Sequence, residues 1–189
     1  MSAQDSKLFV ISGPSGAGKG TLVTRVRERR SNLGLTVSAT TRAPRKGEVD
    51  GVNYFFLTRE EFDRRVANGE FVEWAEVHGN CYGTLVSEVQ SKLASGSSLI
   101  LEIDAQGALQ VKERFPEAVL IFIKPPSLEV LRERLVGRGT ETPETIELRM
   151  ANAADELALA DRYDDVVVND DLDRATDELV RVLDMHERI

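Results

Sequence analysis

A glycine-rich segment at residues 13–21 constrains the fold of this chain more than any other feature. It follows a short, unbroken apolar run at 8–11, which is typical of a strand buried on both faces, and it leads into a helix-forming segment at 21–30. Glycines allow successive backbone N–H groups to point at one anion, and the following helix adds the positive end of its dipole. The order of strand, glycine turn and helix therefore predicts a phosphate-binding loop.

The loop reads GPSGAGKGT and nearly matches the ATP-binding pattern G-x-x-x-x-G-K-[ST], in which Lys19 reaches the β- and γ-phosphates. The departure is Gly20, because a Ser or Thr usually contacts Mg²⁺ at that position. Thr21 follows one residue later, and its hydroxyl is the candidate to contact Mg²⁺ in place of position 20, directly or through water. The predicted ATP-binding residues of the loop are Gly13, Pro14, Ser15, Gly16, Ala17, Gly18, Lys19, Gly20 and Thr21.

A second short motif, D-x-x-G, runs from Asp104 to Gly107 and also occurs in GTP-binding switch proteins. The motif is short and nonspecific, and the chain has no N-K-x-D motif to recognise guanine. A GTPase is therefore disfavoured.

Strands and helices alternate through most of the chain. Buried strands are predicted at 8–11, 98–103, 119–123 and 165–168, and helices at 21–30, 107–114, from 128, from 143 to about 160, and from 172. Ser127 is a candidate N-cap, and Thr142 with Pro143 predicts an N-cap followed by proline in the first helical position. This order predicts an α/β fold with a parallel sheet flanked by helices.

Residues 36–96 interrupt the alternation. Short strands are predicted at 36–38, 54–56 and 71–74, with one helix at about 60–68, which indicates a small mixed lobe inserted into the core. A glycine- and charge-rich segment beginning at 137 has the composition of a mobile flap. We therefore predict one domain over 1–189, with a core (7–35, 97–136 and 161–189), an inserted lobe (36–96) and a lid region (137–160).

Composition excludes several classes of protein. The chain of 189 residues has 24 Lys and Arg against 32 Asp and Glu, a net charge of −8, which argues against a protein that coats nucleic acid or anionic membranes. No apolar stretch has the length of a membrane span, and the first residues do not resemble a secretory leader. Because Cys81 is the single cysteine, no internal disulfide is expected, and a cytoplasmic location is the simplest. The oligomeric state is left open.

A basic loop at 40–56 contains Arg42 and Arg45 on either side of a proline, and Tyr54 follows in the sequence. Arginine forks match phosphate oxygens, and a phenol adds a neutral donor, so the loop can hold a phosphomonoester. The alternative is a solvated basic turn.

Six motifs together resemble the guanylate kinase family in order and spacing. They are GPSGAGKG, SATTRAPRKGEVDGVNYFF, EWAEVHGNCYGT, LEIDAQG, GRGTET and VVVNDDL, and the resemblance covers about 7–184. It implies a P-loop NTPase core with an inserted mixed α/β GMP-binding lobe and a short lid. It also implies the reaction ATP + GMP ⇌ ADP + GDP, with dGMP as a further acceptor, with Mg²⁺, in purine nucleotide metabolism and GMP recycling.

The resemblance implies a guanine pocket that the residue chemistry supports. Glu73 and Glu102 would accept from the N1–H and 2-amino groups, and Ser38 and Thr84 would serve O6 or the adjoining ring edge. Without the resemblance, each acid taken alone is better interpreted as a surface or strand-end carboxylate. The GMP-binding residues implied by the resemblance are Ser38, Arg42, Arg45, Tyr54, Glu73, Tyr82, Thr84, Glu102 and Asp104, of which Arg42, Arg45, Tyr54 and Tyr82 hold the phosphate.

The chemistry predicted for this family is phosphate attacking phosphate. Because the second pKa of a phosphomonoester is near 6, GMP is mostly dianionic at neutral pH and no general base is required. Positioning and charge neutralisation remain the tasks of the protein. The predicted catalytic cations are Lys19, Arg42, Arg134, Arg138 and Arg149.

Two acidic residues, Asp104 and Asp171, keep two interpretations. Asp104 either binds Mg²⁺ through water or is a strand-end acid that bonds the hydroxyls of the phosphate loop. Asn169 is expected at the ATP base pocket, and Asp171 is either part of that segment or the N-cap of the last helix.

Two rival functions are disfavoured by particular residues. A scaffold module that has lost ATP chemistry would not be expected to keep Gly13, Gly18 and Lys19. A kinase for another nucleotide does not suit the paired acids Glu73 and Glu102, because adenine would leave both facing unsuitable groups.

Overall fold

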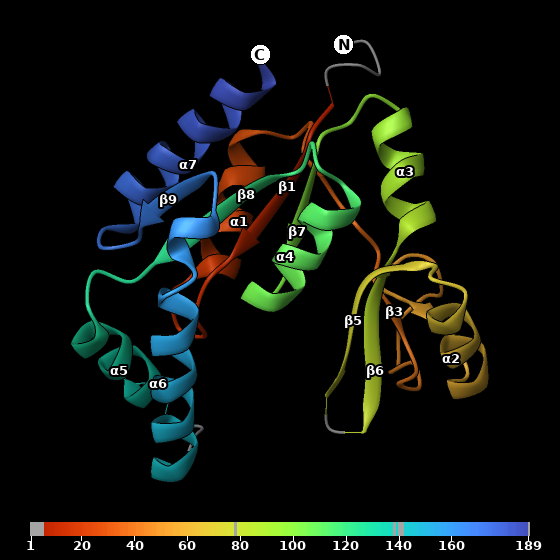
Figure 1. The fold of residues 1–189 in the computed structure, drawn as a ribbon, viewed down its shortest axis with the longest axis horizontal. Helices are drawn as coiled ribbons and strands as arrows, with labels where there is room; N and C mark the ends of the chain where they lie inside the picture. The colour runs from red at the N-terminus through yellow and green to blue at the C-terminus, as the bar shows by residue number, and fades with distance from the viewer. Residues whose placement is uncertain (1–5, 78, 138, 140–141, 189) are drawn as a thin grey trace.

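The core is a parallel sheet of five strands in the order β2-β7-β1-β8-β9. A computed structural model describes residues 6–77, 79–137, 139 and 142–188 of the chain (Figure 1). The strands of the core sheet are β1 (Leu8–Ser12), β2 (Gly34–Leu35), β7 (Leu99–Glu102), β8 (Val119–Lys124) and β9 (Asp165–Val168). Since all the pairings are parallel, the carboxyl ends of the strands lie along one edge, where ligands of such sheets bind.

Helices cover both faces of this sheet. Helices α1 (Lys19–Arg29) and α7 (Leu172–Glu187) share an apolar cluster with Phe9 and Ile11 of β1. Helices α3 (Val86–Ala94) and α4 (Ala105–Arg114) share a second cluster with Leu8 and Val10. Successive residues of β1 thus enter opposite apolar layers, which is why the strand is apolar throughout. The predicted α/β core is confirmed.

A second sheet carries the lobe, a name used here for residues 39–85. Its strand order is β4-β3-β6-β5, formed by β3 (Ala39–Thr40), β4 (Phe55–Phe56), β5 (Phe71–Val77) and β6 (Asn80–Leu85). Strand β3 is parallel to β4 and antiparallel to β6, so the sheet is mixed. Helix α2 (Arg59–Ala67) packs on it through Phe62, whose ring lies 4.3 Å from that of Phe71 between centroids.

Helices α5 (Leu128–Gly137) and α6 (Pro143–Leu157) form a separate arm on the other side of the core from the lobe (Figure 1). Ser127 accepts a hydrogen bond from Val130 N, and Thr142 accepts one from Thr145 N with Pro143 at the start of the helix. Both predicted N-caps are therefore confirmed. The arm packs through Leu131, Leu135 and Ala153.

Several predicted boundaries differ from the structure. The strand predicted at 36–38 is wrong, because β2 ends at Leu35 in the core sheet and β3 begins at Ala39 in the lobe sheet. The three residues between them carry the chain from one sheet to the other. Helix α1 begins at Lys19, immediately after the left-handed Gly18, and α6 ends at Leu157 before a short 3-10 turn at Ala160–Arg162.

Strand β6 and helix α3 were not predicted as separate elements. Side chains of α3 pack into a cluster of the core, although α3 lies within the segment predicted as the inserted lobe. The domain boundaries themselves stay a prediction. In the part of the chain that the structure describes, no helix has both the length and the apolar character needed to cross a membrane.

Candidate active site

The phosphate loop connects β1 to α1 and depends on glycine at two close contacts. At Gly13, which has φ of 139°, a Cβ would lie 2.2 Å from the carbonyl oxygen of Ile123. At Gly18, with φ of 92°, a Cβ would lie 2.3 Å from Nδ2 of Asn169. Both positions combine a left-handed backbone with a neighbour that leaves no room for a side chain. The loop is thus shaped by its surroundings as well as by its sequence.

Lys19 lies across the loop. Its Nζ donates to the carbonyl oxygen of Gly13 at 2.5 Å and to that of Pro14 at 3.2 Å. The ammonium group is therefore held at the mouth of the loop, next to the backbone that the glycines turn inward. This placement suits a cation that meets the phosphates of a bound nucleotide.

Asn169 and Arg134 brace the other side of the loop. Asn169, which is buried, donates through Nδ2 to the carbonyl oxygen of Ala17 at 2.7 Å. Arg134 of α5 donates to the carbonyl oxygen of Asn169 at 2.8 Å and more weakly to that of Ala17 at 3.4 Å. The carboxyl end of β9 and helix α5 are thus joined at the phosphate loop.

Of the predicted residues Arg138, Arg149 and Asp171, the structure describes Arg149 and Asp171. Arg149 of α6 donates to the hydroxyl of Ser15, so the arm also reaches the phosphate loop. Arg138 lies outside the described residues. Asp171 accepts a hydrogen bond from Arg174 N at 2.9 Å, so it is the N-cap of α7.

A cleft of about 570 Å³ opens between the lobe and the carboxyl edge of the core sheet. Most of the side chains predicted to bind GMP line it, and they come from both sheets. The cleft is lined, among others, by Gly20, Ser38, Tyr54, Glu73, Tyr82, Thr84 and Glu102. Gly20 belongs to the phosphate-loop motif, so this cleft adjoins the loop directly.

Glu73 is the most buried acid of the cleft. It stands opposite Thr84 in the pairing of β5 with β6. Burial raises the pKa of the Glu73 carboxyl above its ordinary value, the Thr84 hydroxyl partly lowers this pKa, and the charge of Asp104 raises it. A donor-rich ligand edge placed here would favour the charged carboxylate.

Arg42 is held by an acid that the sequence did not single out. Its guanidinium makes a two-pronged contact with Glu48, at 2.8 and 3.0 Å, and Glu48 also accepts from Arg45 N at 2.6 Å. The Glu48 contact raises the pKa of Arg42, and the same bond lowers the pKa of Glu48. The ring of Tyr54 lies 5.4 Å from the guanidinium carbon of Arg42. Glu48 therefore orients Arg42 toward the tyrosines of the cleft.

The ring of Tyr82 lies next to that of Tyr54 in the corner predicted to bind the GMP phosphate. Its centroid lies 6.2 Å from that of Tyr54. The nearby Tyr82 hydroxyl further raises the pKa of Arg42. The structure therefore brings Arg42, Tyr54 and Tyr82 together, as predicted. The Arg45 side chain is exposed.

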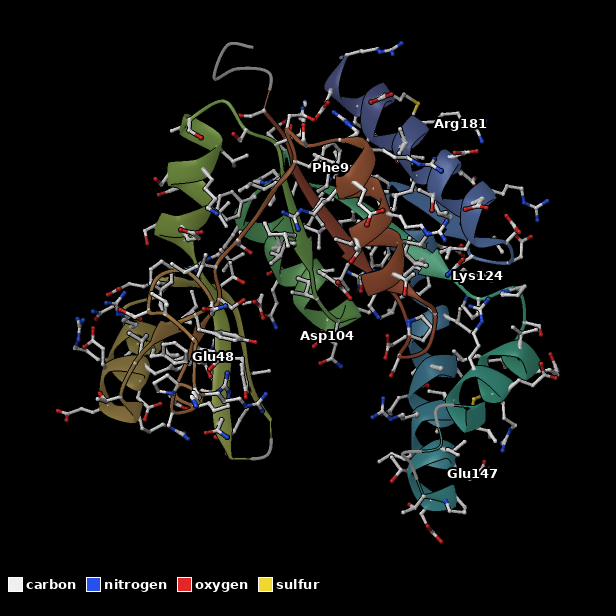
Figure 2. The ribbon with its side chains drawn as sticks, turned by 180° about the vertical axis from the view of Figure 1, so that it is seen from behind. Phe9, Glu48, Asp104, Lys124, Glu147 and Arg181 are labelled. Carbon is white, nitrogen blue, oxygen red and sulfur yellow. The ribbon has the colours of Figure 1, made fainter. Side chains whose placement is uncertain are left out.

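Asp104 lies beside the cleft. Its Oδ1 accepts from Gly107 N at 2.8 Å, which makes it the N-cap of α4. It lines a neighbouring hollow of about 480 Å³, shared with Asp155 and Glu156 of α6. Figure 2 shows Asp104 between the lobe, which carries Glu48, and the arm, which carries Glu147.

The carboxylates present suit a magnesium ion that arrives with a nucleotide. A Cβ built on Gly20 would lie 3.7 Å from both carboxylate oxygens of Glu102, so an acid occupies the space beside the missing Ser or Thr. Among the described residues no three His, Cys, Asp or Glu side chains gather as a metal site. Mg²⁺ commonly takes only one or two carboxylates together with substrate phosphates and water, so these residues fit it.

Arg27 and Thr24 are cleft residues that sequence reasoning missed. Both line the same cleft as Glu73 and lie on α1. Helical spacing contained the signal, because Gly20, Thr24 and Arg27 recur at intervals of about one turn and share a helix face.

The fold and the site together define a class of protein. A phosphate loop at the carboxyl edge of a parallel sheet, adjoining an acid-lined cleft under a second sheet, is the arrangement of a P-loop phosphotransferase with two nucleotide seats. The guanylate kinase family model matches residues 5–186. The chain belongs to the guanylate kinase family and transfers a phosphoryl group from ATP to GMP, giving ADP and GDP.

Individual relatives agree with this assignment. The chain is 51% identical to a guanylate kinase of Halalkalibacterium halodurans, over 97% of this chain and 90% of that protein. It is 56% identical to a guanylate kinase of Gloeobacter violaceus, over 94% of this chain and 87% of that protein. The crystal structure of guanylate kinase from Anaplasma phagocytophilum superimposes with a TM-score of 0.71 at 37% identity, covering 96% of this chain and 86% of that one.

Proposed function

We propose that the phosphate loop holds ATP, that the lobe cleft holds GMP, and that the phosphoryl group passes between them past Gly20. The observation that carries this proposal is the position of Gly20, which belongs to the phosphate-loop motif and also lines the cleft that contains Glu73 and Glu102. Gly20 itself therefore places no side chain between the loop and the cleft. Lining up two reactants in this way is worth several orders of magnitude in rate.

The guanine base is selected by acceptors and hydroxyls from both sheets. Glu73 of β5 and Glu102 of β7 accept from the N1–H and 2-amino groups, while Ser38 and Thr84 bond O6 or the adjoining edge. An adenine base offers different groups along this edge, so it leaves buried polar groups unpaired. The burial of Glu73 supports this role, because a contact in a dry site discriminates more than one in water.

The GMP phosphate is held by Arg42, Arg45, Tyr54 and Tyr82. Support comes from the meeting of Arg42 with both tyrosine rings and from the Glu48 contact that fixes the direction of its guanidinium. Glu48 leaves the guanidinium in place before the substrate arrives. A preoriented cation loses less entropy on binding than a mobile one.

Transfer itself depends on cations and on exclusion of water. Lys19, Arg42, Arg134, Arg138 and Arg149 neutralise charge on the transferring group, and no base is needed because the acceptor is already an anion. The contacts of Arg134 and Arg149 with the phosphate loop support a role for the arm in this step. Residues 137–160 act as the lid, whose closure keeps water from taking the phosphoryl group.

The ATP seat takes the nucleotide with Mg²⁺. Bound with ATP, the ion offsets the negative charge of the β- and γ-phosphates. Thr21, which follows Gly20 in the sequence, would help to hold the ion directly or through water, and Asp104 would contribute through water. Asn169 lines the adenine side of the loop. We also expect a cytoplasmic enzyme, in keeping with its single cysteine.

A substrate panel tests these assignments. Formation of ADP should require both GMP and Mg-ATP in a coupled assay. With GMP, dGMP, AMP, CMP and UMP as acceptors, GMP and dGMP should react fastest. Turnover with AMP above that with GMP would remove the guanine assignment of the cleft.

A further inference from the structure

Arg114 joins the core to the lobe at the point where the lobe strand β5 begins. It lies in the last turn of α4, and its guanidinium donates to the carbonyl oxygen of Phe71 and, at 2.7 Å, to that of Gly69. Both acceptors are backbone atoms far from Arg114 in the sequence. One side chain thus ties a core helix to two points of the lobe main chain.

Gly69 is shaped to receive this arginine. It ends α2 with φ of 66°, and its N–H donates to the carbonyl oxygen of Val66 at 3.0 Å. A Cβ at this position would lie 3.1 Å from the Nη2 atom of Arg114, closer than a side chain comfortably packs. The left-handed backbone after α2 favours glycine here, and a side chain would crowd the guanidinium.

The anchored segment is also where β5 changes its register. Phe71 is paired with Leu85, but Glu73 is paired with Thr84, so β5 has one extra residue at this point. Phe71 packs in the apolar cluster of the lobe, whereas the next residue, Val72, packs in a cluster of the core. Such a bulge re-aims the side chains that follow it. The direction of Glu73 is therefore set by where the carbonyl of Phe71 is held.

Helix α4 touches β5 a second time, at its other end. The Cβ of Glu73 lies 3.7 Å from the position that a Cβ on Gly107 would take, and Gly107 N donates to Asp104. One rigid helix therefore contacts Glu73 through its first turn and fixes the start of the strand through Arg114 in its last turn. The two contacts together determine how Glu73 lies relative to the core.

We propose that Arg114 is a positioning residue for guanine recognition: by holding the carbonyls of Gly69 and Phe71, it fixes the bulge of β5 that aims Glu73 into the cleft. Arg114 itself does not touch the substrate. The inference rests on the proposed role of Glu73 as an acceptor for the guanine base. It adds a specificity determinant on the outer side of β5, away from the nucleotide.

The test is the selectivity of Arg114→Met. This variant keeps a long side chain but removes both hydrogen bonds. We expect the KM for GMP to rise about tenfold or more, because small displacements of a binding group are costly, while the KM for ATP changes little. Inosine monophosphate lacks the 2-amino group, so the preference for GMP over inosine monophosphate should fall as well.

Two further variants separate positioning from stability. Lys112→Met removes a cation of the same helix that donates to the carbonyl oxygen of Ala118 at 2.6 Å, a contact within the core. It should lower thermal stability without changing the GMP preference. Arg114→Lys keeps a cationic donor but has a single nitrogen in place of the two that reach Gly69 and Phe71, so it should show an intermediate selectivity, which also provides a readout if Arg114→Met does not fold.

The outcomes distinguish this inference from the proposed function. A wild-type enzyme that prefers GMP, together with Arg114 variants that keep its KM and selectivity, would overturn the positioning role alone. Equal increases in the KM for GMP and ATP would overturn it too, since they indicate general damage. A wild-type enzyme without a preference for GMP would overturn both.

Discussion

The side chain of Asn169 donates to the carbonyl oxygen of Ala17 at 2.7 Å, which ties the carboxyl end of β9 directly to the phosphate loop. The next residue of the loop, Gly18, lies so close that an added Cβ would come within 2.3 Å of the same amide nitrogen. The loop and Asn169 therefore form one unit.

Gly18→Ala should weaken the binding of ATP and leave the binding of GMP nearly unaffected. The added methyl group displaces either the loop or Asn169, and we expect the KM for ATP to rise about tenfold or more. Steady-state kinetics at saturating GMP measure it. Gly79→Ala is the control, because Gly79 also has a left-handed φ of 79° but nothing lies within 4 Å of its added Cβ. An equal rise of the KM for ATP in both variants would mean that backbone strain, and not the contact with Asn169, weakens ATP binding.

Lys19→Ala should lower kcat at least about a hundredfold, as expected when a charge-stabilising group is removed. The same loss is predicted from sequence for Arg138→Ala. Single-turnover measurements with both nucleotides bound report the transfer step. Arg181→Ala removes an exposed cation of α7 and should have no effect (Figure 2). Near-wild-type transfer without Lys19 would show that the phosphoryl group passes elsewhere.

Glu73→Gln should lower the affinity for GMP and leave the affinity for ATP unchanged. An amide presents a donor where the base presents donors, so one contact becomes unfavourable. Isothermal titration with each nucleotide separates the two affinities. Glu76→Gln is a matched control on the same strand, since Glu76 pairs with Arg59 at 3.0 Å on the lobe surface. Equal losses for GMP and ATP would contradict the assigned role of Glu73.

Glu73→Gln should also make the folded, unliganded protein more stable than wild type at neutral pH. Because burial raises the pKa of Glu73, the folded state binds the proton more tightly than the unfolded state. The stabilisation from the protonated form is present below the ordinary glutamate pKa of about 4.3 and is lost as the pH rises through the raised value. Wild type should therefore lose stability relative to Glu73→Gln over this range. Thermal melts at several pH values check it; a stability difference that does not vary with pH would contradict the prediction.

Glu48→Gln should raise the KM for GMP severalfold. The change weakens the two-pronged contact that orients Arg42. Glu61→Gln is the control, because Glu61 pairs with Arg64 and Arg65 on α2, and these contacts lower the pKa of Glu61 to about 2. Kinetics with GMP as the varied substrate should separate the two variants. An unchanged KM in Glu48→Gln would mean that Arg42 is oriented without it.

Local signals were sufficient for much of the fold. Thr142 followed by Pro143 marks a helix start wherever it lies, and the structure confirms both that cap and the one at Ser127. The strand predicted at 36–38 failed because the pattern cannot show that the chain leaves one sheet for another there. Strand β6 directly follows β5 as the second strand of a hairpin, but its other partner, β3, is distant in sequence, and the local pattern does not show that pairing.

Some residues of the candidate site could be predicted from sequence motifs and others could not. Residues within recognisable motifs, such as Glu73 and Tyr82, were predicted and meet in one cleft. Glu48 and Arg114 were not singled out, because their functions depend on a partner. Arg114 bonds main-chain carbonyls, which carry no mark in the sequence. Contacts of this kind become visible only when the tertiary structure is known.

In the proposed arrangement of two nucleotide seats, Gly20 places no side chain between them, and the carboxylate of Glu102 borders its position. A single inhibitor with a nucleoside at each end of a polyphosphate chain would therefore span both seats without meeting a side chain from this position. Such a molecule would engage donor and acceptor contacts at once, and its affinity would gain from the linkage.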